Sequence, residues 1–203
     1  RQVTCLLADD IDLDGQNEVI AGTGLWNVHA FDDGGRDLWK TPAYARRILS
    51  LAAGALSGNG EKDLVIGTSY YTLSAYNARG QVLFAYTGEP RFQHVLVNDL
   101  DADQQPEVIA ANANRLVVLD VQRDRLQPRT YVKGMNLPRA SSVRFQFDAG
   151  DEVNSVMVVD SNTDTSPAII AGTESGYVYC FDAHGKLLHL RNAGDAIRAL
   201  ASG

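Results

Sequence analysis

Short apolar segments alternate along this chain with polar loops rich in Asp, Asn and Gly. One segment occurs in four similar copies, which begin at Glu18, Asp63, Glu107 and Ala168. The copies start 45, 44 and 61 residues apart, so the third interval contains an insertion, which we place between Arg123 and Asp151. Residues 177–181 alternate with a period of two, and no long segment has the 3.6-residue period of a helix. The repeat is therefore predicted to consist of strands.

Each repeat contains the signals of four strands. An apolar run opens the repeat, at 3–8, 48–53, 92–97 and 153–158. An acidic loop, the repeated segment and a Gly-rich turn follow, and a third strand then ends in a large apolar residue and Asp or Asn. In two repeats a turn, Asn77–Gly80 or Asp182–Gly185, leads into a fourth strand. Four short strands per 40–50 residues are typical of a β-propeller blade, because one such sheet cannot bury both of its faces alone.

We therefore predict an all-β chain: a β-propeller segment of four four-stranded blades plus the first strand of a fifth. The whole chain, 1–203, forms one segment with blades at about 1–44, 45–88, 89–150 (with the insertion near 123–151) and 151–194, and with 195–203 starting the next blade. A larger ring is the favoured context, while a half-ring that pairs with another copy and a compact four-bladed ring are the alternatives. A generic β-sandwich would have no reason to repeat the same turn chemistry four times.

Composition limits the partners. The chain has 203 residues, of which 45% are hydrophobic, so it can bury a sizeable core. Its formal net charge is -7 and it has no dense basic run, which argues against binding to nucleic acid. No stretch approaches the roughly 20 apolar residues that a membrane span requires.

The first acidic loop has the pattern of a calcium site. Asp10, Asp12 and Asp14 alternate, Gly15 permits a sharp turn, and Glu18 closes the set. A tight loop turns every second side chain inward, and the carbonyl of Gln16 can add a further oxygen. Several hard oxygen ligands in flexible geometry are the chemistry of Ca²⁺, which would also relieve the repulsion among these carboxylates. The alternative is a solvated acidic turn.

The third repeat has a second loop of this kind. Its predicted ligands are Asp99, Asp101, Asp103, Gln105 and Glu107. Gln104 stands where the first loop has Gly15, and a left-handed conformation there would cost about 1 kcal/mol. The second repeat (Ala55, Ser57, Asn59, Asp63) and the fourth (Asp160, Asn162, Asp164, Ala168) have lost charge, so hydrogen-bonded turns without metal are expected there.

The motif from Asp10 to Ile20, echoed from Asp99 to Ile109, resembles the FG-GAP/VCBS type of repeat found in integrin α-subunit-like propellers. The last blade, from Gly172 to Leu188, looks more like the quinoprotein-type blades of PQQ-dependent enzymes. The resemblance covers nearly the whole chain outside the insertion. It implies that the acidic loops hold calcium for stability, at the end of the propeller opposite the one that usually binds partners.

The opposite end would therefore be the ligand-binding end. It is expected to present aromatic and basic side chains from the loops before each first strand and between the second and third strands: Trp26, Tyr44, Arg47, Tyr70, Tyr71, Arg91 and His94. Aromatic rings beside Arg suit sugars or acidic groups, although aromatics that merely cover the seams between blades would look the same. The sequence contains no Gly-x-Ser-x-Gly, His-Glu-x-x-His or Walker motif, so no catalytic residue is assigned.

These observations favour a non-catalytic, calcium-stabilised propeller that binds a glycan or a protein. An extracellular or periplasmic location is expected, because millimolar calcium outside cells suits exposed sites of this kind. The alternative is the propeller portion of a secreted polysaccharide lyase or of a quinoprotein-like enzyme. Association with another copy or with further blades is expected to close the ring.

Overall fold

The computed structural model describes residues 2–41, 47–88, 91–132, 135–159 and 167–201. These residues form four antiparallel sheets of four strands each, in chain order. Sheet one contains β1 (Val3–Asp9), β2 (Glu18–Thr23), β3 (Val28–Phe31) and β4 (Asp37–Lys40). Sheet two contains β5 (Ile48–Gly54), β6 (Asp63–Thr68), β7 (Thr72–Tyr76) and β8 (Val82–Thr87). Sheet three contains β9 (Phe92–Asn98), β10 (Glu107–Asn112), β11 (Arg115–Val121) and β12 (Ser141–Asp148), and sheet four contains β13 (Val153–Val159), β14 (Ala168–Thr173), β15 (Tyr177–Phe181) and β16 (Leu187–Asn192).

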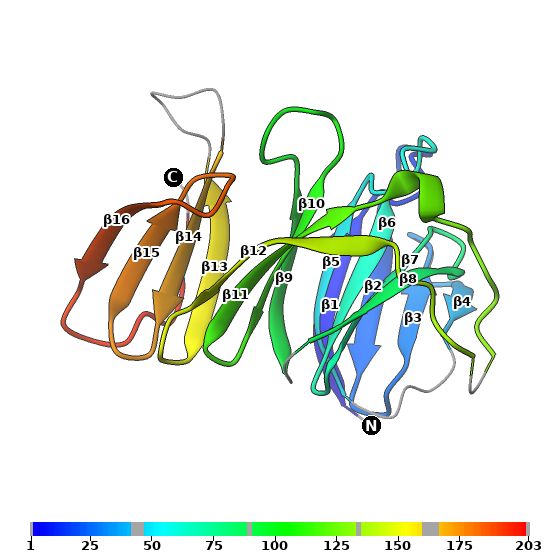
Figure 1. Ribbon diagram of the computed structural model, residues 1–203. Coiled ribbons are helices and arrows are strands. Elements are labelled where there is room, and N and C mark those ends of the chain that lie inside the picture. The colour runs from blue at the N-terminus through cyan, green and yellow to red at the C-terminus, as the bar shows by residue number, and fades with distance from the viewer. Residues whose placement is uncertain (1, 42–46, 89–90, 133–134, 160–166, 202–203) are drawn as a thin grey trace.

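The sheets stand side by side, with their first strands innermost. β1 packs beside β5, β5 beside β9, and β9 beside β13, whereas β4 and β16 lie at the outer edges (Figure 1). This arrangement is a β-propeller-like fold, and it confirms the prediction of an all-β chain built from four-stranded repeats. The described residues contain no helix long and apolar enough to cross a membrane.

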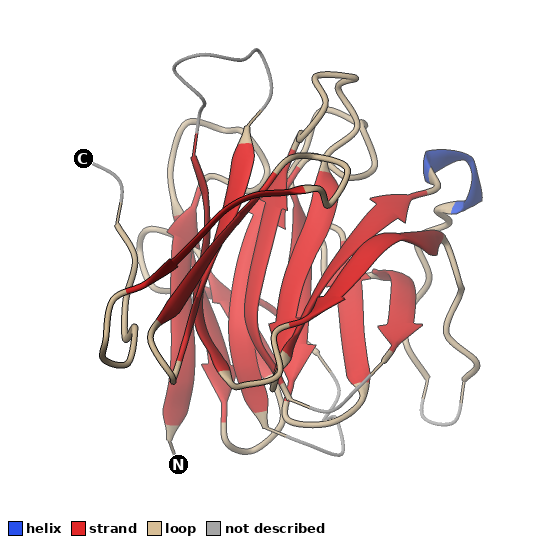
Figure 2. Ribbon diagram, turned by 60° about the vertical axis from the view of Figure 1, so that its left-hand side comes forward, coloured by secondary structure: helices blue, strands red, loops and turns tan. Residues whose placement is uncertain are grey.

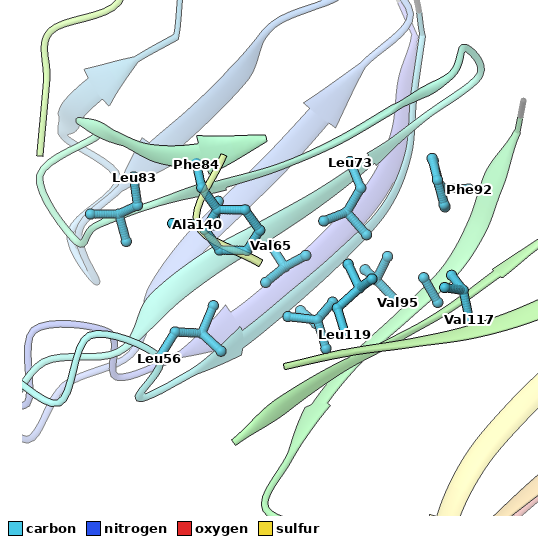
Figure 3. Packing of buried hydrophobic residues seen from close by; sticks show 14 residues of the cluster. Leu56, Val65, Leu73, Leu83, Phe84, Phe92, Val95, Val117, Leu119 and Ala140 are labelled. Atoms are coloured by element: carbon cyan, nitrogen blue, oxygen red, sulfur yellow. The ribbon is translucent and has the colours of Figure 1, made fainter. Parts of the chain in front are cut away.

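The seams between adjacent sheets are numbered in chain order, so that the first lies between sheets one and two. An inner strand contributes side chains to two seams, because successive side chains in a strand point to opposite faces. In β6, Leu64 and Ile66 pack against sheet one, while Val65 packs against sheet three. The second seam is shown in Figure 3, where Val65 and Leu73 of sheet two face Val117 and Leu119 of sheet three. All of these residues except Val117, which is 3% exposed, are fully buried. Alternating apolar residues on both faces are therefore what joins the repeats.

The third seam, between sheets three and four, contains aromatic side chains from both sheets. Ile109, Leu116 and Val118 of sheet three pack against Ile169, Tyr179 and Phe181 of sheet four. Phe147 of β12 joins this cluster, with its ring centroid 4.8 Å from that of Phe181. β12 and β16 belong to neighbouring sheets (Figure 1), and Figure 2 shows the strands from a second side.

The insertion is shorter than the sequence pattern indicates. Part of the segment expected as insertion, 141–148, is β12, which pairs with β11 and completes sheet three. The remainder contains a one-turn 3-10 helix, η1 (Arg123–Arg125), and runs along the edge of sheet two. There the Val82 N–H donates to the Arg129 carbonyl (2.9 Å) and the Ala85 N–H donates to the Pro138 carbonyl (2.9 Å). The insertion thus covers an edge strand that would otherwise present unpaired backbone groups.

Residues 193–201 follow the surface of sheet four without forming a strand. The Ile197 N–H donates to the Thr173 carbonyl (2.9 Å), and the Leu200 N–H donates to the Ser155 hydroxyl (3.1 Å). A Cβ on Gly172 would lie 2.3 Å from Ile197, just as one on Gly22 would lie 2.7 Å from Ile48. The segment predicted to start a fifth blade therefore lies where the first strand of the next blade would lie.

The close approach of adjacent sheets gives a test of the seams. A Cβ at Gly67 would lie 2.5 Å from the Phe92 carbonyl oxygen, which belongs to the backbone of sheet three. We expect Gly67→Ala to push the second seam apart and to lower the free energy of unfolding by about 1–3 kcal/mol. Urea unfolding followed by circular dichroism measures this loss. Gly24→Ala is the matched control, because the nearest atom to its Cβ is 3.6 Å away; equal losses for both variants would contradict the packing described.

Candidate metal centre

The first acidic loop, residues 10–17, joins β1 to β2 and is closed by its own side chains. Asp10 accepts hydrogen bonds from the N–H groups of Asp14 (3.1 Å) and Gly15 (2.9 Å). Asp14 accepts one from the Gln16 N–H (2.8 Å). Gly15 has φ of 94°, which explains the glycine at this turn. Such bonds from Asp to the backbone a few residues on make the loop shape a local property of its sequence.

Three of the predicted ligands converge. Carboxylate oxygens of Asp10, Asp12 and Glu18 all lie within 4.8 Å of one another. Asp14 is not a member of this group, since one of its oxygens is directed to the backbone of Gln16. Three oxygen donors at this spacing, with no soft ligand, fit a hard cation such as Ca²⁺.

Glu18 is the buried member of the group. It is 3% exposed, and one of its oxygens accepts a hydrogen bond from the Ile11 N–H at 2.9 Å. Burial raises the pKa of Glu18, the Ile11 N–H lowers it, and the charges of Asp12, Asp14 and Asp10 raise it further. Within the described parts of the chain, no Lys or Arg forms an ion pair with these four carboxylates. The nearby Lys62 pairs instead with Asp9 (2.6 Å).

The second acidic loop, residues 99–106, joins β9 to β10 and repeats this geometry. Asp99 accepts from the N–H groups of Asp103 (3.2 Å) and Gln104 (2.9 Å), and Asp103 accepts from Gln105 (2.7 Å). Gln104 has φ of 66° and so adopts the left-handed conformation that Gly15 has in the first loop. Oxygens of Asp99, Asp101 and Glu107 lie within 4.8 Å of one another, and Asp103 again lies outside the group.

A cationic side chain enters this second loop. The guanidinium of Arg144, from β12, lies 2.9 Å from Asp101 and donates hydrogen bonds to Glu107 (2.9 Å) and to Asp120 (2.5 Å). The pKa of Glu107 is raised to about 7, mainly by burial and also by the charges of Asp101 and Asp103, and the Leu100 N–H and Arg144 offset part of this rise. The 2.9 Å contact between Arg144 and Glu107 has the length of a charge-assisted hydrogen bond, so we treat Glu107 as ionised. Sequence reasoning did not find Arg144, which is far from the loop in sequence and lies within the segment expected to be insertion.

An arginine from another part of the chain also contacts the loop of the second repeat. Arg123, from η1, donates to the carbonyls of Leu56 (2.8 Å), Ala55 (3.0 Å) and Gln104 (2.6 Å). Asp63 is fully buried and accepts from the Ser57 N–H (2.6 Å), and burial raises its pKa. This loop is a hydrogen-bonded turn, as its lost charges predict. In the fourth repeat, Asp160, Asn162 and Asp164 lie outside the described residues, and Ala168 is buried at the start of β14.

Part of the predicted ligand-binding set comes together at the opposite end of the sheets. Tyr70 and Tyr71, in the turn between β6 and β7, are 43% and 41% exposed and meet edge to face at 4.6 Å. The Arg91 N–H donates to the Tyr70 carbonyl (3.3 Å), and the Ser69 N–H donates to the Arg47 carbonyl (2.9 Å). Tyr70, Tyr71, Arg47 and Arg91 therefore form one group.

The remaining members of that set are Trp26, His94 and Tyr44. Trp26 is 43% exposed in the turn between β2 and β3, and His94 lies half-buried on β9. Burial lowers the pKa of His94, and a hydrogen bond with the backbone of Asn154 offsets part of this effect. Tyr44 lies outside the described residues. The Arg91 guanidinium is partly engaged, 3.1 Å from Gln93 and 3.6 Å from Glu152.

Comparisons with known proteins concern the fold alone. No protein-family model matches the chain, and no curated protein matches it. Among solved structures, the chain is similar to Raptor from Chaetomium thermophilum, with a TM-score of 0.62 and 16% sequence identity over 97% of this chain. It spans 17% of the length of that protein.

Proposed function

We propose that the chain is a calcium-stabilised, non-catalytic β-propeller module that binds a glycan or a protein ligand outside the cytoplasm. One observation carries the calcium part of the proposal. Glu18 is buried beside Asp10 and Asp12, and no ion pair neutralises them within the described residues. A buried carboxylate without a positive charge beside it costs several kcal/mol, and burial next to like charges adds to that cost.

A bound Ca²⁺ would remove this cost. Ca²⁺ accepts many oxygen ligands in flexible geometry and tolerates the backbone carbonyls and waters that an open loop supplies, whereas Mg²⁺ demands a near-ideal octahedron. Asp10, Asp12 and Glu18 would hold the ion, and the Gln16 carbonyl is a candidate for a further ligand. Exposed loops of low affinity are filled at millimolar calcium, which supports an extracellular or periplasmic location.

The aromatic group supports the ligand part of the proposal. Tyr70 and Tyr71 expose two rings that meet edge to face, in a turn whose backbone is hydrogen-bonded to Arg47 and Arg91. Exposed Tyr supplies an apolar face with a polar tip, which suits both sugar rings and protein surfaces. The acidic loops occupy the other end of the sheets, so a metal ion there would stabilise the module without contacting the ligand.

We also propose that the four sheets belong to a larger ring. Val19, Leu64, Val108 and Ile169 occupy equivalent positions, each in the second strand of its sheet and on the face that looks toward the preceding sheet. Three of them are fully buried in seams, whereas Val19 is 40% exposed. Leu6, on the same face of sheet one, is 66% exposed. At the other end of the row of sheets, Ile170 and Val178 of sheet four are half-buried, while the residues at the same positions in the other three sheets are buried. Further blades would cover both faces.

The calcium site is tested by thermal unfolding. We expect calcium at 100 times its Kd to raise the free energy of unfolding by about 2.7 kcal/mol, which corresponds to about 5–11 °C in Tm for a chain of this size. Glu18→Gln should abolish this response, since it removes the buried charged ligand. Asp33→Asn removes one exposed negative charge that does not belong to the carboxylate cluster, and it should keep the response. A wild-type Tm that does not respond to calcium or EDTA would refute the site.

The ligand-binding end is tested by binding of the purified protein to glycan arrays and by turnover assays on acidic polysaccharide. We expect Tyr71→Ala to lower the affinity for any glycan that binds by about tenfold or more, which is equivalent to about 1.4 kcal/mol. Val132→Ala, which trims an exposed side chain elsewhere (65% exposed), should leave binding unchanged. Release of an unsaturated, ultraviolet-absorbing product would show instead that the protein is a lyase.

The larger ring is tested by introducing charged residues on the exposed face of sheet one. In the native protein, Leu6→Glu combined with Val19→Glu should lower the free energy of unfolding by about 2–5 kcal/mol, as expected for disruption of a packed seam. Val132→Glu should change it by less than about 0.5 kcal/mol. Equal and small effects would mean that the face is exposed to solvent and that no blade covers it. Light scattering that gives a dimer would assign the cover to a second copy.

A further inference from the structure

The two acidic loops have the same shape but differ in what neutralises them. In both, the first Asp closes the loop onto two backbone N–H groups, and a buried Glu accepts one N–H from the residue after that Asp. Glu18 and Glu107 are 3% and 2% exposed. Among the described residues, a guanidinium enters only the second loop, where Arg144 contacts Asp101 and Glu107 at 2.9 Å each. The Arg144 side chain is itself only 16% exposed.

A β-bulge places Arg144 there. β11 and β12 pair Val118 with Phe145 and Leu119 with Val143, so Arg144 has no partner in the ladder. A bulged residue bends its strand and re-aims its side chain. In this case the side chain reaches the loop that joins the first two strands of the same sheet.

The same bulge occurs in all four sheets, which identifies the equivalents of Arg144. The unpaired residue is Leu38 in sheet one, Leu83 in sheet two and Leu188 in sheet four. Leu38 lines a hollow of about 420 Å³ together with Asp12 and Asp14, so the bulge position of sheet one also faces its acidic loop. The first loop therefore has leucine at the position from which the second loop receives arginine.

We propose that Arg144 is a built-in cation that takes the place of calcium in the loop 99–107. Its guanidinium neutralises Asp101 and Glu107, and a divalent ion at the same oxygens would be placed against a buried positive charge. The calcium expected there from the sequence does not fit the residues present. The loop 10–18 remains the calcium site, and this part of the inference rests on the proposed function.

Calorimetric titration with Ca²⁺ alone, on the full chain, tests the inference by counting ions. The wild type should bind one ion. Arg144→Leu recreates the situation of the first loop and should bind two, and adding Glu107→Gln should return the count to one. Leu38→Arg introduces the cation into the first loop and should lower its calcium affinity at least tenfold. Circular dichroism confirms that each variant is folded.

The outcomes separate this inference from the calcium proposal for the first loop. A wild type that binds two ions, one lost in Glu18→Gln and the other in Glu107→Gln, would overturn the role of Arg144. So would a folded Arg144→Leu that gains no ion. A wild type that binds none, with one ion gained in Arg144→Leu, would refute the first site and support the built-in cation. Where Arg144→Leu does not fold, Leu38→Arg decides, because unchanged calcium affinity in that variant would contradict the inference.

Discussion

Every sheet in this protein has two apolar faces, and the structure depends on covering both. Adjacent residues of one strand, such as Leu64 and Val65, enter different seams and are both fully buried. A sheet of four short strands has no other way to bury such residues, since its own layer is one residue thick. The repeats are therefore units of packing that require neighbours, and Val19 is 40% exposed on a face of sheet one that no described residue covers.

The parts of the structure that could be predicted from the sequence are those set by short-range interactions. The loop shapes depend on hydrogen bonds between residues two to seven positions apart, as between Asp10 and Gly15, so the acidic motif alone predicts them. Gln104 adopts the left-handed conformation because the rest of its loop imposes it. The period of the repeat likewise predicts the strands, since one apolar pattern is used in every sheet.

The parts that could not be predicted depend on contacts between distant residues. Arg144 lies 37 residues from Glu107 in sequence, and only the bulge in β12 brings it to the loop. β12 itself was assigned to the insertion, because the inserted residues displace it from its usual place in the period. Arg123 reaches the loop of sheet two from the insertion, across 67 residues of sequence from Leu56. Periodicity identifies equivalent positions, but it does not indicate that one of them holds a charge.

The loops of sheets one, two and three thus differ in whether an arginine contacts their oxygen atoms, and this difference bears on stability. In sheets two and three, arginines from within the chain donate to loop oxygens, and both sheets have neighbours on each side. Sheet one has an uncovered face and no such arginine within the described residues. Its loop is coupled directly to the first seam, because the Ile11 N–H that binds Glu18 belongs to a residue buried in that seam. A cation at Glu18 would therefore stabilise a sheet that has a packed neighbour on one face only among the described residues.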